Sequence, residues 1–169
     1  MPVEEHRREA EGLEINLGLI ITSDSILRGV KRDEITPIVE RVCEDYRAAL
    51  KGRRVVPNKE GEIRKAFEDL LGSCNVIVVT GGTGISPRDI TVDTLKSYCG
   101  KDMPGFGELF RYLTFTEYGS AAIASRSFAC VSGTALLFVL PGSPDAVELA
   151  LRKLIMPEAR HLLYELRKT

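Results

Sequence analysis

The stretch NVIVVTGGTGISPRDIT, from Asn75 to Thr91, decides the fold class that this sequence predicts. Four branched apolar residues run directly into a loop with three glycines, and an aspartate follows in the same loop. A short, continuous apolar run is typical of a strand that is covered on both faces. Glycines at its end let the backbone turn tightly and approach another group closely. The stretch therefore predicts a buried strand that ends in a bare backbone loop.

The segments before this stretch alternate between strand and helix patterns. NLGLIITSD is a nearly continuous apolar run, and the apolar residues between Asp33 and Leu50 recur at helical spacing. Such alternation with short connections indicates parallel βαβ units, so we expect a three-layer α/β/α sandwich with a mostly parallel central sheet. The expected elements are strands at 16–24, 53–58 and 75–80, a helix at 33–50 that stops at Gly52, and a helix at 62–71 that stops at Gly72.

The second half of the chain is less regular. FACVSGTALLFVL predicts a small β-hairpin with Ser132 and Gly133 at its turn. Pro144 is expected to open a helix, because proline is well tolerated in a first turn. We expect helical segments at 93–98, 103–119, 144–155 and 161–168, whereas AAIA at 121–124 is too short to classify.

Composition and charge exclude several classes of protein. The 169 residues suit one domain, and 23 basic against 24 acidic residues give a formal net charge of −1. This balance provides no overall field that would gather nucleic acid or a membrane surface, and no apolar run is long enough to span a bilayer. Residues 1–14 are charged and lack the apolar stretch of a signal peptide. We therefore expect a loose leader or a short arm at 1–14, a single domain at 15–169 and a cytoplasmic location.

Cysteine and histidine offer no obvious site in this sequence. The four cysteines are far apart and form no CxxC pair, so we expect unpaired, small apolar or surface residues at Cys43, Cys74, Cys99 and Cys130. His6 lies in the charged leader and His161 in the last expected helix, so neither is expected to act as a catalytic base.

A ligand site is expected at one edge of the sheet. Ligands of open parallel sheets bind beyond the carboxyl ends of the strands. Gly81, Gly82 and Gly84 suit a phosphate cradle at this edge, since glycines let backbone N–H groups approach an anion. The alternative is a plain glycine-rich turn, because neither GxGxxG nor GK[ST] is present. The loops expected at the edge are Thr22–Asp24, Thr80–Asp89 and Pro141–Pro144.

Charged residues near these loops fit a nucleotide. Asp89 follows the glycines and is placed to hold the Mg²⁺ of a nucleotide, which prefers one or two carboxylates beside phosphate oxygens. Its alternative role is an N-cap for the helix that begins near Thr91. Asp24 is either a second carboxylate of the site or simply a turn residue. The segment Ser125–Ser127 presents two hydroxyls and a guanidinium, which suit a second phosphate.

Five segments together resemble the MoaB/MogA family of molybdenum cofactor biosynthesis proteins. They are TGGTGISPRDIT, DMPGFGELFR, ASRS, LPGSPDAVELAL and PEARHLLYELR, and the likeness extends from Leu17 onward. The terminal segment is closer to the MoaB branch. The resemblance implies a three-layer α/β fold and a homotrimer or homohexamer. It also implies adenylylation of molybdopterin with Mg²⁺ and ATP, releasing pyrophosphate, with the downstream molybdate- or tungstate-insertion protein as a partner.

The resemblance assigns roles to individual residues. It makes Asp89 one of two catalytic acids, acting through Mg²⁺. The second acid of the family follows a Val-Pro pair, where this chain has Asn58, whose amide brings no charge to a metal. The resemblance implies a nucleotide and pterin groove that consists of Thr80, Gly81, Gly82, Thr83, Gly84, Ser125, Arg126, Pro141, Gly142, Ser143 and Pro144. Ser23, Asp24 and Ser86 are further candidate binding residues because they lie in the loops expected at the same edge.

Two other functions stay open on the sequence. The first is a CinA-type nucleotide-processing domain, although the loop of that type usually has a leucine between glycines and paired aspartates, unlike TGGTG and PRD. The second is a non-catalytic molybdopterin-binding or scaffold protein, which Asn58 favours. Fold alone does not decide among these functions.

Overall fold

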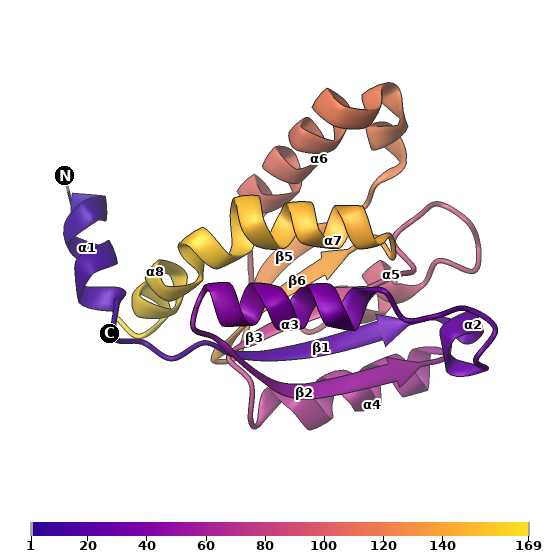
Figure 1. Cartoon of the computed structure of the whole chain (residues 1–169), viewed down its shortest axis with the longest axis horizontal. Helices are drawn as coiled ribbons and strands as arrows, with labels where there is room; N and C mark the ends of the chain where they lie inside the picture. Colours follow the sequence, from indigo (N-terminus) through magenta and orange to yellow (C-terminus); the bar gives the residue numbers. More distant parts are fainter. Residues whose placement is uncertain (1, 169) are drawn as a thin grey trace.

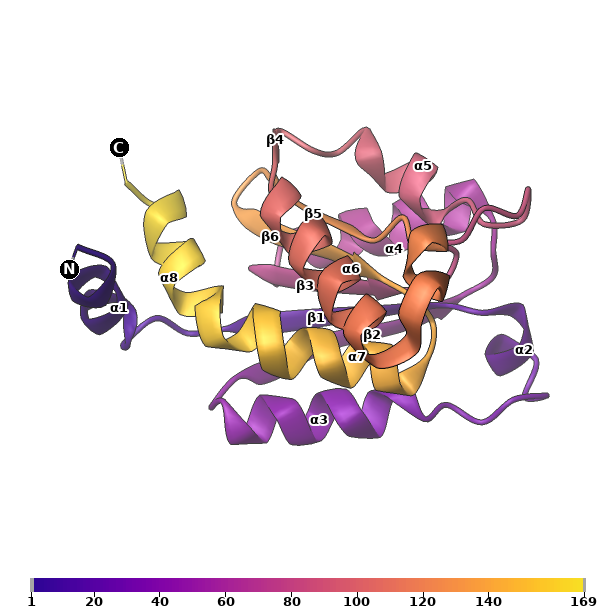
Figure 2. The ribbon, with the colours of Figure 1, turned by 90° about the horizontal axis from the view of Figure 1, so that it is seen from above.

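The computed structural model describes residues 2–168 and has a six-stranded mixed sheet between two layers of helices (Figures 1 and 2). The strand order is β2-β1-β3-β6-β5-β4, in which β2, β1, β3 and β6 are parallel and β5 pairs antiparallel with both β6 and β4. The predicted three-layer sandwich and its hairpin excursion are therefore confirmed. The strands are β1 (Asn16–Thr22), β2 (Ala49–Val56), β3 (Val76–Thr80), β4 (Lys101–Asp102), β5 (Phe128–Ser132) and β6 (Ala135–Leu140).

Each face of the sheet carries its own hydrophobic core. Val76 and Val78 of β3 belong to the core on one face, whereas Ile77 and Val79 belong to the core on the other. This alternation is the ordinary period of a strand and explains why β3 reads as a continuous apolar run. The first face is covered by α3 (Ile35–Asp45), α6 (Pro104–Tyr118), α7 (Pro144–Ala150), η2 (Leu151–Ile155) and α8 (Met156–Leu166), and the second by α4 (Glu60–Leu71) and α5 (Thr91–Lys96).

The expected helix at 33–50 is too long, and the expected strand after it is too short. The helix α3 ends at Asp45, and Arg47 takes a left-handed φ of 53° that stops it. The chain then pairs at once with β1, so β2 begins at Ala49. Gly52 is consequently not a helix stop. It pairs with Gly18, and a Cβ at Gly52 would lie 2.4 Å from the Leu70 side chain.

The C-terminal helices form one bent run instead of two separate helices (Figure 1). Between α7 and α8 lies the π-helical turn η2, in which the Met156 N–H donates to the Leu151 carbonyl. Proline has no backbone N–H, so Pro157 in the first turn of α8 cannot continue a regular hydrogen-bond ladder. The missing donor accounts for the wider turn at this place.

Two expectations, one about the N-terminal segment and one about the cysteines, are wrong. The described part of this segment is not a loose leader, because α1 (Pro2–Ala10) is a helix that contacts α8 and buries Ala10 fully. A disulfide joins Cys99, which follows α5, to Cys130 of β5, whereas Cys43 and Cys74 are free and buried. The contact of α1 with α8 and the bond of Cys99 with Cys130 both join segments that are far apart in the sequence, and local residue patterns do not predict such contacts.

The remaining differences are small. The expected turn of helix at 93–98 is α5, which begins at Thr91, and AAIA lies in the 3-10 helix η1 (Gly119–Ala124). The hairpin turn holds Gly133 with a φ of 58°, between the paired residues Ser132 and Ala135. The short strand β4 and the helix α2 (Asp24–Leu27) were not expected. No helix within residues 2–168 has the length and apolarity that a membrane crossing requires.

Asp33 caps the first turn of α3 and makes its stability depend on pH. Its Oδ1 accepts hydrogen bonds from the N–H groups of Ile35 at 2.9 Å and Thr36 at 3.0 Å. Burial raises the pKa of Asp33, but the hydrogen bonds from Thr36, Arg53 and Ile35 outweigh this and lower the pKa to about 2. The unfolded value is near 3.8. The stabilisation is therefore complete above the unfolded pKa and is lost as the pH falls towards about 2.

We expect Asp33→Asn to lower the free energy of unfolding by about 1–2 kcal/mol at neutral pH, and to have almost no effect near pH 2. Urea unfolding at both pH values measures the difference, with the exposed Asp69→Asn as the control for loss of one carboxylate. An equal loss of stability at both pH values would contradict the assignment.

Candidate functional site

Three loops meet at the carboxyl edge of the parallel strands, as expected from the topology. The N–H of Ser23, after β1, donates to the Val56 carbonyl of β2 at 3.0 Å, and the N–H of Gly81, after β3, donates to the Leu140 carbonyl of β6 at 2.9 Å. A Cβ at Gly142 would lie 3.4 Å from the Gly81 Cα. The loops after β1, β3 and β6 thus form one continuous surface.

The glycines of the central loop are required by the protein itself. Gly81 and Gly82 have φ values of 92° and 69°, which side-chain-bearing residues rarely adopt. A Cβ at Gly81 would lie 2.4 Å from the Thr22 carbonyl oxygen, and a Cβ at Gly82 would lie 2.2 Å from the Thr91 Oγ1. The loop is therefore packed tightly against the last residue of β1 and the first residue of α5. This packing fixes the place of the loop but does not by itself identify a ligand.

Buried polar atoms without partners surround this loop. Among residues 2–168, the side-chain atoms in this state are Thr22 Oγ1, Asn58 Oδ1, Thr80 Oγ1 and Thr91 Oγ1. The first and third of these end β1 and β3, and Thr91 touches the loop at Gly82. Buried polar groups are normally hydrogen-bonded. Their gathering at this edge indicates a place where the protein offers hydrogen bonds to a bound polar group or to water.

A polar hollow of about 320 Å³ lies on one side of the loop. It brings together hydroxyls, two carboxylates and two guanidinium-bearing residues. Its lining consists of Thr22, Ser23, Asp24, Ser25, Arg28, Asn58, Gly82, Arg88 and Asp89. This set of charges is suited to phosphates and a divalent cation.

A second hollow, which we term the apolar hollow, has a volume of about 390 Å³. Small and apolar side chains from α6, η1 and the loop after β6 dominate it. Its lining consists of Gly82, Thr83, Gly84, Asp89, Phe110, Thr114, Ala121, Ala122, Ala124, Ser125, Pro141, Gly142, Ser143 and Ala146. Gly82 and Asp89 line both hollows, so the two adjoin at the glycine loop.

Asp89 is held by its own loop and does not cap α5. Its Oδ2 accepts the N–H of Ser86 at 3.1 Å, and its own N–H donates to the Ser86 carbonyl at 2.9 Å. The N-cap residue of α5 is Ile90, which makes no side-chain cap. The alternative role as a helix cap is therefore wrong. Asp89 itself lines both hollows.

Asn58 lies beside Asp24 and beside the segment that carries Asp89. Its N–H donates to Asp24 Oδ1 at 3.3 Å, and its side-chain Nδ2 donates to the Arg88 carbonyl. Its Oδ1 is buried without a partner. The end of β2 is thus placed next to Asp24 and to the segment that carries Asp89.

Arg126 stabilises the glycine loop and does not line either hollow. Its Nε donates to the Gly84 carbonyl at 3.1 Å, and its Nη2 donates to the Asp89 carbonyl at 3.3 Å. Its Nη1 and Nη2 also form a bidentate ion pair with Asp93, at 3.1 Å and 2.8 Å. The hydrogen bonds within this pair raise the pKa of Arg126 and lower the pKa of Asp93. These contacts give the guanidinium a positioning role, while its expected phosphate contact stays a prediction.

The other expected site residues lie in several different places in the structure. Ser23 and Asp24 line the polar hollow, and Thr83, Gly84, Ser125, Pro141, Gly142 and Ser143 line the apolar hollow. Thr80 and Gly81 are buried beneath the loop, and Ser86 is exposed and lines neither hollow. Pro144 lines a separate hollow of about 580 Å³ together with Arg32, Pro37 and Arg41.

Several residues of the two hollows were not singled out in the sequence. They are Thr22, Ser25, Arg28 and Arg88 in the polar hollow, and Phe110, Thr114 and the alanines of η1 in the apolar hollow. Arg88 could have been predicted as a site residue, because it directly precedes Asp89 in the sequence. No local pattern marks Phe110 or Thr114, because α6 brings them to the edge from a distant part of the chain.

Comparisons with known proteins agree with this architecture. Residues 18–161 match the family described as a probable molybdopterin binding domain. The molybdenum cofactor biosynthesis protein B of Staphylococcus epidermidis is 50% identical over 171 residues, covering 96% of this chain and 97% of that protein. These matches extend over nearly the whole domain.

Two solved structures are similar over almost their entire length. A crystal structure of molybdenum cofactor biosynthesis protein B has a TM-score of 0.86 and 29% identity, covering 93% of this chain and 98% of that chain. The tungsten cofactor synthesizing protein MoaB from Pyrococcus furiosus has a TM-score of 0.81 and 31% identity, covering 92% and 98%. The resemblance drawn from the five sequence segments is confirmed, and the chain belongs to the MoaB/MogA family of molybdenum cofactor biosynthesis proteins.

Proposed function

We propose that this protein adenylylates molybdopterin with Mg-ATP and releases pyrophosphate. The observation that supports the proposal best is the pair of adjoining hollows that share Gly82 and Asp89. A transfer between two substrates requires both to be bound with their reacting groups next to each other. Two hollows of different chemistry that meet at one carboxylate meet this requirement.

The chemistry of each hollow suits one substrate. The polar hollow offers the cations Arg28 and Arg88 to phosphates and the hydroxyls of Ser23 and Ser25 as further donors. The apolar hollow offers small and apolar side chains, among them Ala121, Ala124 and Pro141, which suit a ring system such as a pterin. We therefore assign ATP to the polar hollow and molybdopterin to the apolar hollow.

The residues present fit a magnesium ion at the junction. Asp89 and Asp24 are carboxylates, and the carbonyl oxygen of Asn58 is a neutral oxygen donor without a partner in the protein. Mg²⁺ is commonly held by one or two carboxylates together with substrate phosphates. When bound, the ion neutralises charge on the phosphate oxygens of ATP and of the leaving pyrophosphate.

The proposed reaction requires positioning more than a side-chain nucleophile. A terminal phosphate oxygen of molybdopterin attacks the α-phosphorus of ATP, a new P–O bond forms, and the bond to the pyrophosphate oxygen breaks. Arg28 and Arg88 are placed to offset the charge on the phosphates. Arg126 keeps the glycine loop in place through its bonds to Gly84 and Asp89. Asp89, which lines both hollows, would hold the metal, and the metal would offset charge on the phosphates.

The similar proteins support the pterin half of this proposal. The matching family is described as molybdopterin binding, and the relatives are named for molybdenum cofactor biosynthesis. We propose that the adenylylated product passes to the protein that inserts molybdate or tungstate. We also propose a homotrimer or homohexamer, because Leu109, Tyr112 and Phe115 on α6 expose 54%, 66% and 59% of their surface and suit burial against a second copy.

One assay tests the proposed function. Purified protein is incubated with ATP, Mg²⁺ and molybdopterin, and pyrophosphate and adenylylated molybdopterin are measured together. We expect both products in equal amounts, and none without the pterin. Binding of molybdopterin without any product would favour the scaffold function, whereas breakdown of nucleotide without the pterin would favour a CinA-type activity.

Asn58→Asp tests how much a negative charge at the second acid position contributes to turnover. The substitution restores a carboxylate at nearly constant volume but loses the Nδ2 donor to the Arg88 carbonyl. We expect turnover to rise several-fold at saturating Mg²⁺, and ATP binding to weaken without Mg²⁺, because the new carboxylate joins Asp24 and Asp89.

Initial rates over a range of Mg²⁺ concentrations measure this effect. Asn58→Ala is the matched control, since it loses the same donor without adding charge. If Asn58→Asp and Asn58→Ala change turnover equally at every Mg²⁺ concentration, Asn58 is not next to the metal.

A further inference from the structure

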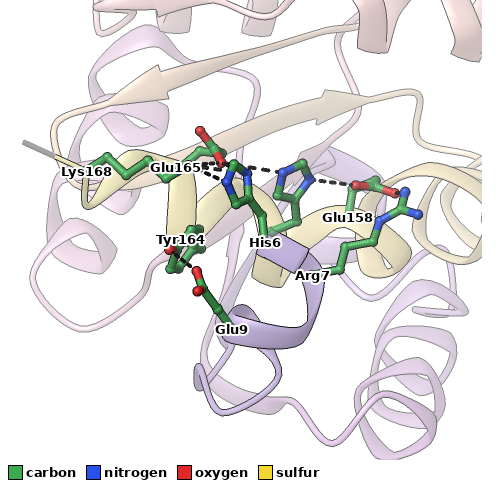
Figure 3. Close-up of polar contacts among 8 residues, drawn as sticks. His6, Arg7, Glu9, Glu158, Tyr164, Glu165 and Lys168 are labelled. Atoms are coloured by element: carbon green, nitrogen blue, oxygen red, sulfur yellow. Dashed lines mark hydrogen bonds and ion pairs between the residues drawn. The ribbon is translucent and has the colours of Figure 1, made fainter. Parts of the chain in front are cut away.

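Both histidines of the chain meet in one cluster, although they come from its two ends. His6 lies in α1 and His161 in α8, and their ring centroids are 6.2 Å apart. Glu165 follows one turn after His161 on the same helix. Its Oε1 lies 2.9 Å from His6 Nδ1 and 3.6 Å from His161 Nε2. Figure 3 shows His6 and Glu165 facing each other across the contact between the two helices.

The three side chains have the chemistry and spacing of metal ligands. One donor atom from each of His6, His161 and Glu165 lies within 4.8 Å of the others. Two imidazoles and one carboxylate form a common ligand set for Zn²⁺, and donors around a tetrahedral ion are roughly 3.3 Å apart. Metal binding at this place therefore requires the three side chains to move closer together.

A fourth residue orients one of the imidazoles. Glu158 Oε2 lies 3.1 Å from His161 Nδ1, while its Oε1 accepts a hydrogen bond from Arg7. When Glu158 accepts the Nδ1–H of a neutral His161 ring, Nε2 is the nitrogen with a free lone pair, and this atom is the one near Glu165. Metal-binding histidines usually have such a partner on the second ring nitrogen.

We propose that His6, His161 and Glu165 bind a divalent transition metal such as Zn²⁺, with Glu158 orienting His161. Open coordination positions would be filled by water. The site is separate from the two hollows, because α1 and α8 lie at the end of the sheet opposite the loops that follow β1, β3 and β6 (Figure 1). The ion would therefore fasten α1 to α8 and take no part in the proposed reaction.

Lys168 competes with a metal for this site. Its Nζ lies 2.7 Å from Glu165 Oε1 and 3.3 Å from both ring nitrogens of His6. An ammonium at this place repels a divalent cation and has to move away when the metal binds. Removing its charge is therefore expected to strengthen metal binding, whereas a purely structural ion-pair network would be weakened by the same change.

Zinc titration of the full-length protein tests the proposal. The affinity tag is free of histidine and is removed, and the pH is about 7.5, where unperturbed imidazole is mostly neutral. We expect one Zn²⁺ per chain with a dissociation constant in the micromolar range by calorimetry. We also expect Zn²⁺ to slow amide hydrogen exchange in α1, because binding couples α1 to α8. Co²⁺ is expected to give visible absorption bands of a coordinated ion.

Variants separate metal binding from simple helix docking. His161→Ala is expected to weaken Zn²⁺ binding by at least ~10²-fold, Glu158→Gln by about tenfold, and Lys168→Ala to strengthen it several-fold. Glu62→Gln removes an exposed carboxylate on α4 and is the control that leaves binding unchanged. Circular dichroism checks that each variant is folded.

Two results would overturn the proposal. One is Zn²⁺ binding that is equally tight in wild type and in the His6→Ala, His161→Ala double variant. The other is Lys168→Ala weakening both Zn²⁺ binding and α1 protection. In either case the cluster is an ion-pair network that docks α1 on α8.

Discussion

Asp89→Asn is expected to lower the rate of pyrophosphate release by at least ~10²-fold at saturating substrates, because a lost charge partner in a transition state is commonly worth about 3 kcal/mol. The amide has the same shape and retains an oxygen to accept the N–H of Ser86, a bond that spans 3.1 Å in the wild type. The loop is therefore expected to keep its position. Only the charge at the junction of the two hollows is lost, so the free energy of unfolding is expected to change little.

Single-turnover and steady-state rates at several Mg²⁺ concentrations measure the effect of Asp89→Asn. Asp69→Asn removes one exposed carboxylate from α4, away from both hollows, and is expected to retain wild-type rates. Wild-type turnover in Asp89→Asn would falsify the assignment of this residue to the reacting centre.

Gly82→Ala is expected to weaken ATP binding by tenfold or more, because two separate costs fall on one position. The left-handed φ of 69° is unfavourable for alanine, and the new Cβ would lie 2.2 Å from the Thr91 Oγ1 and 3.3 Å from the Thr91 nitrogen. The loop has to shift away from the start of α5 and out of its place between the hollows. We also expect a loss of about 1–3 kcal/mol in the free energy of unfolding.

Gly133→Ala is the matched control for this substitution. Gly133 also has a left-handed φ, of 58°, but a Cβ there would meet no atom within 4 Å. Its position in the hairpin turn is remote from both hollows, so only the backbone strain is shared. Calorimetric titration with ATP and urea unfolding distinguish the two variants. Equal ATP affinity in wild type and in folded Gly82→Ala would place the phosphates elsewhere.

The parallel part of the fold could be predicted because its signals are local. A buried strand such as β3 is marked by a continuous apolar run, and a covering helix such as α4 by apolar residues at helical spacing. Once the strands are known to be parallel, the loops after β1, β3 and β6 have to meet at one edge. The edge that holds the candidate site was therefore visible in the sequence.

The limits of α3 and β2 could not be predicted from the same signals. The residues Arg47 to Leu50 satisfy helical spacing, yet the backbone turns at Arg47 and pairs with β1. The hydrogen bonds of a parallel ladder come from a strand distant in sequence, and they outweigh a local helical preference that is worth only tenths of a kcal/mol per residue. The helix α1 was missed for a related reason, since its partner α8 lies at the other end of the chain.

The candidate site shows the same division between local and distant information. The glycines and Asp89 stand out in the sequence because special backbone geometry and charge are properties of single residues, and Asn58 stands out because the resembling family has an acid at its position. The sequence does not reveal that Arg126 binds Asp93 and the loop carbonyls, nor that α6 lines a second hollow beside the first. Nor does it bring His6 to His161. These arrangements depend on contacts between segments far apart in the chain, which packing in three dimensions alone selects.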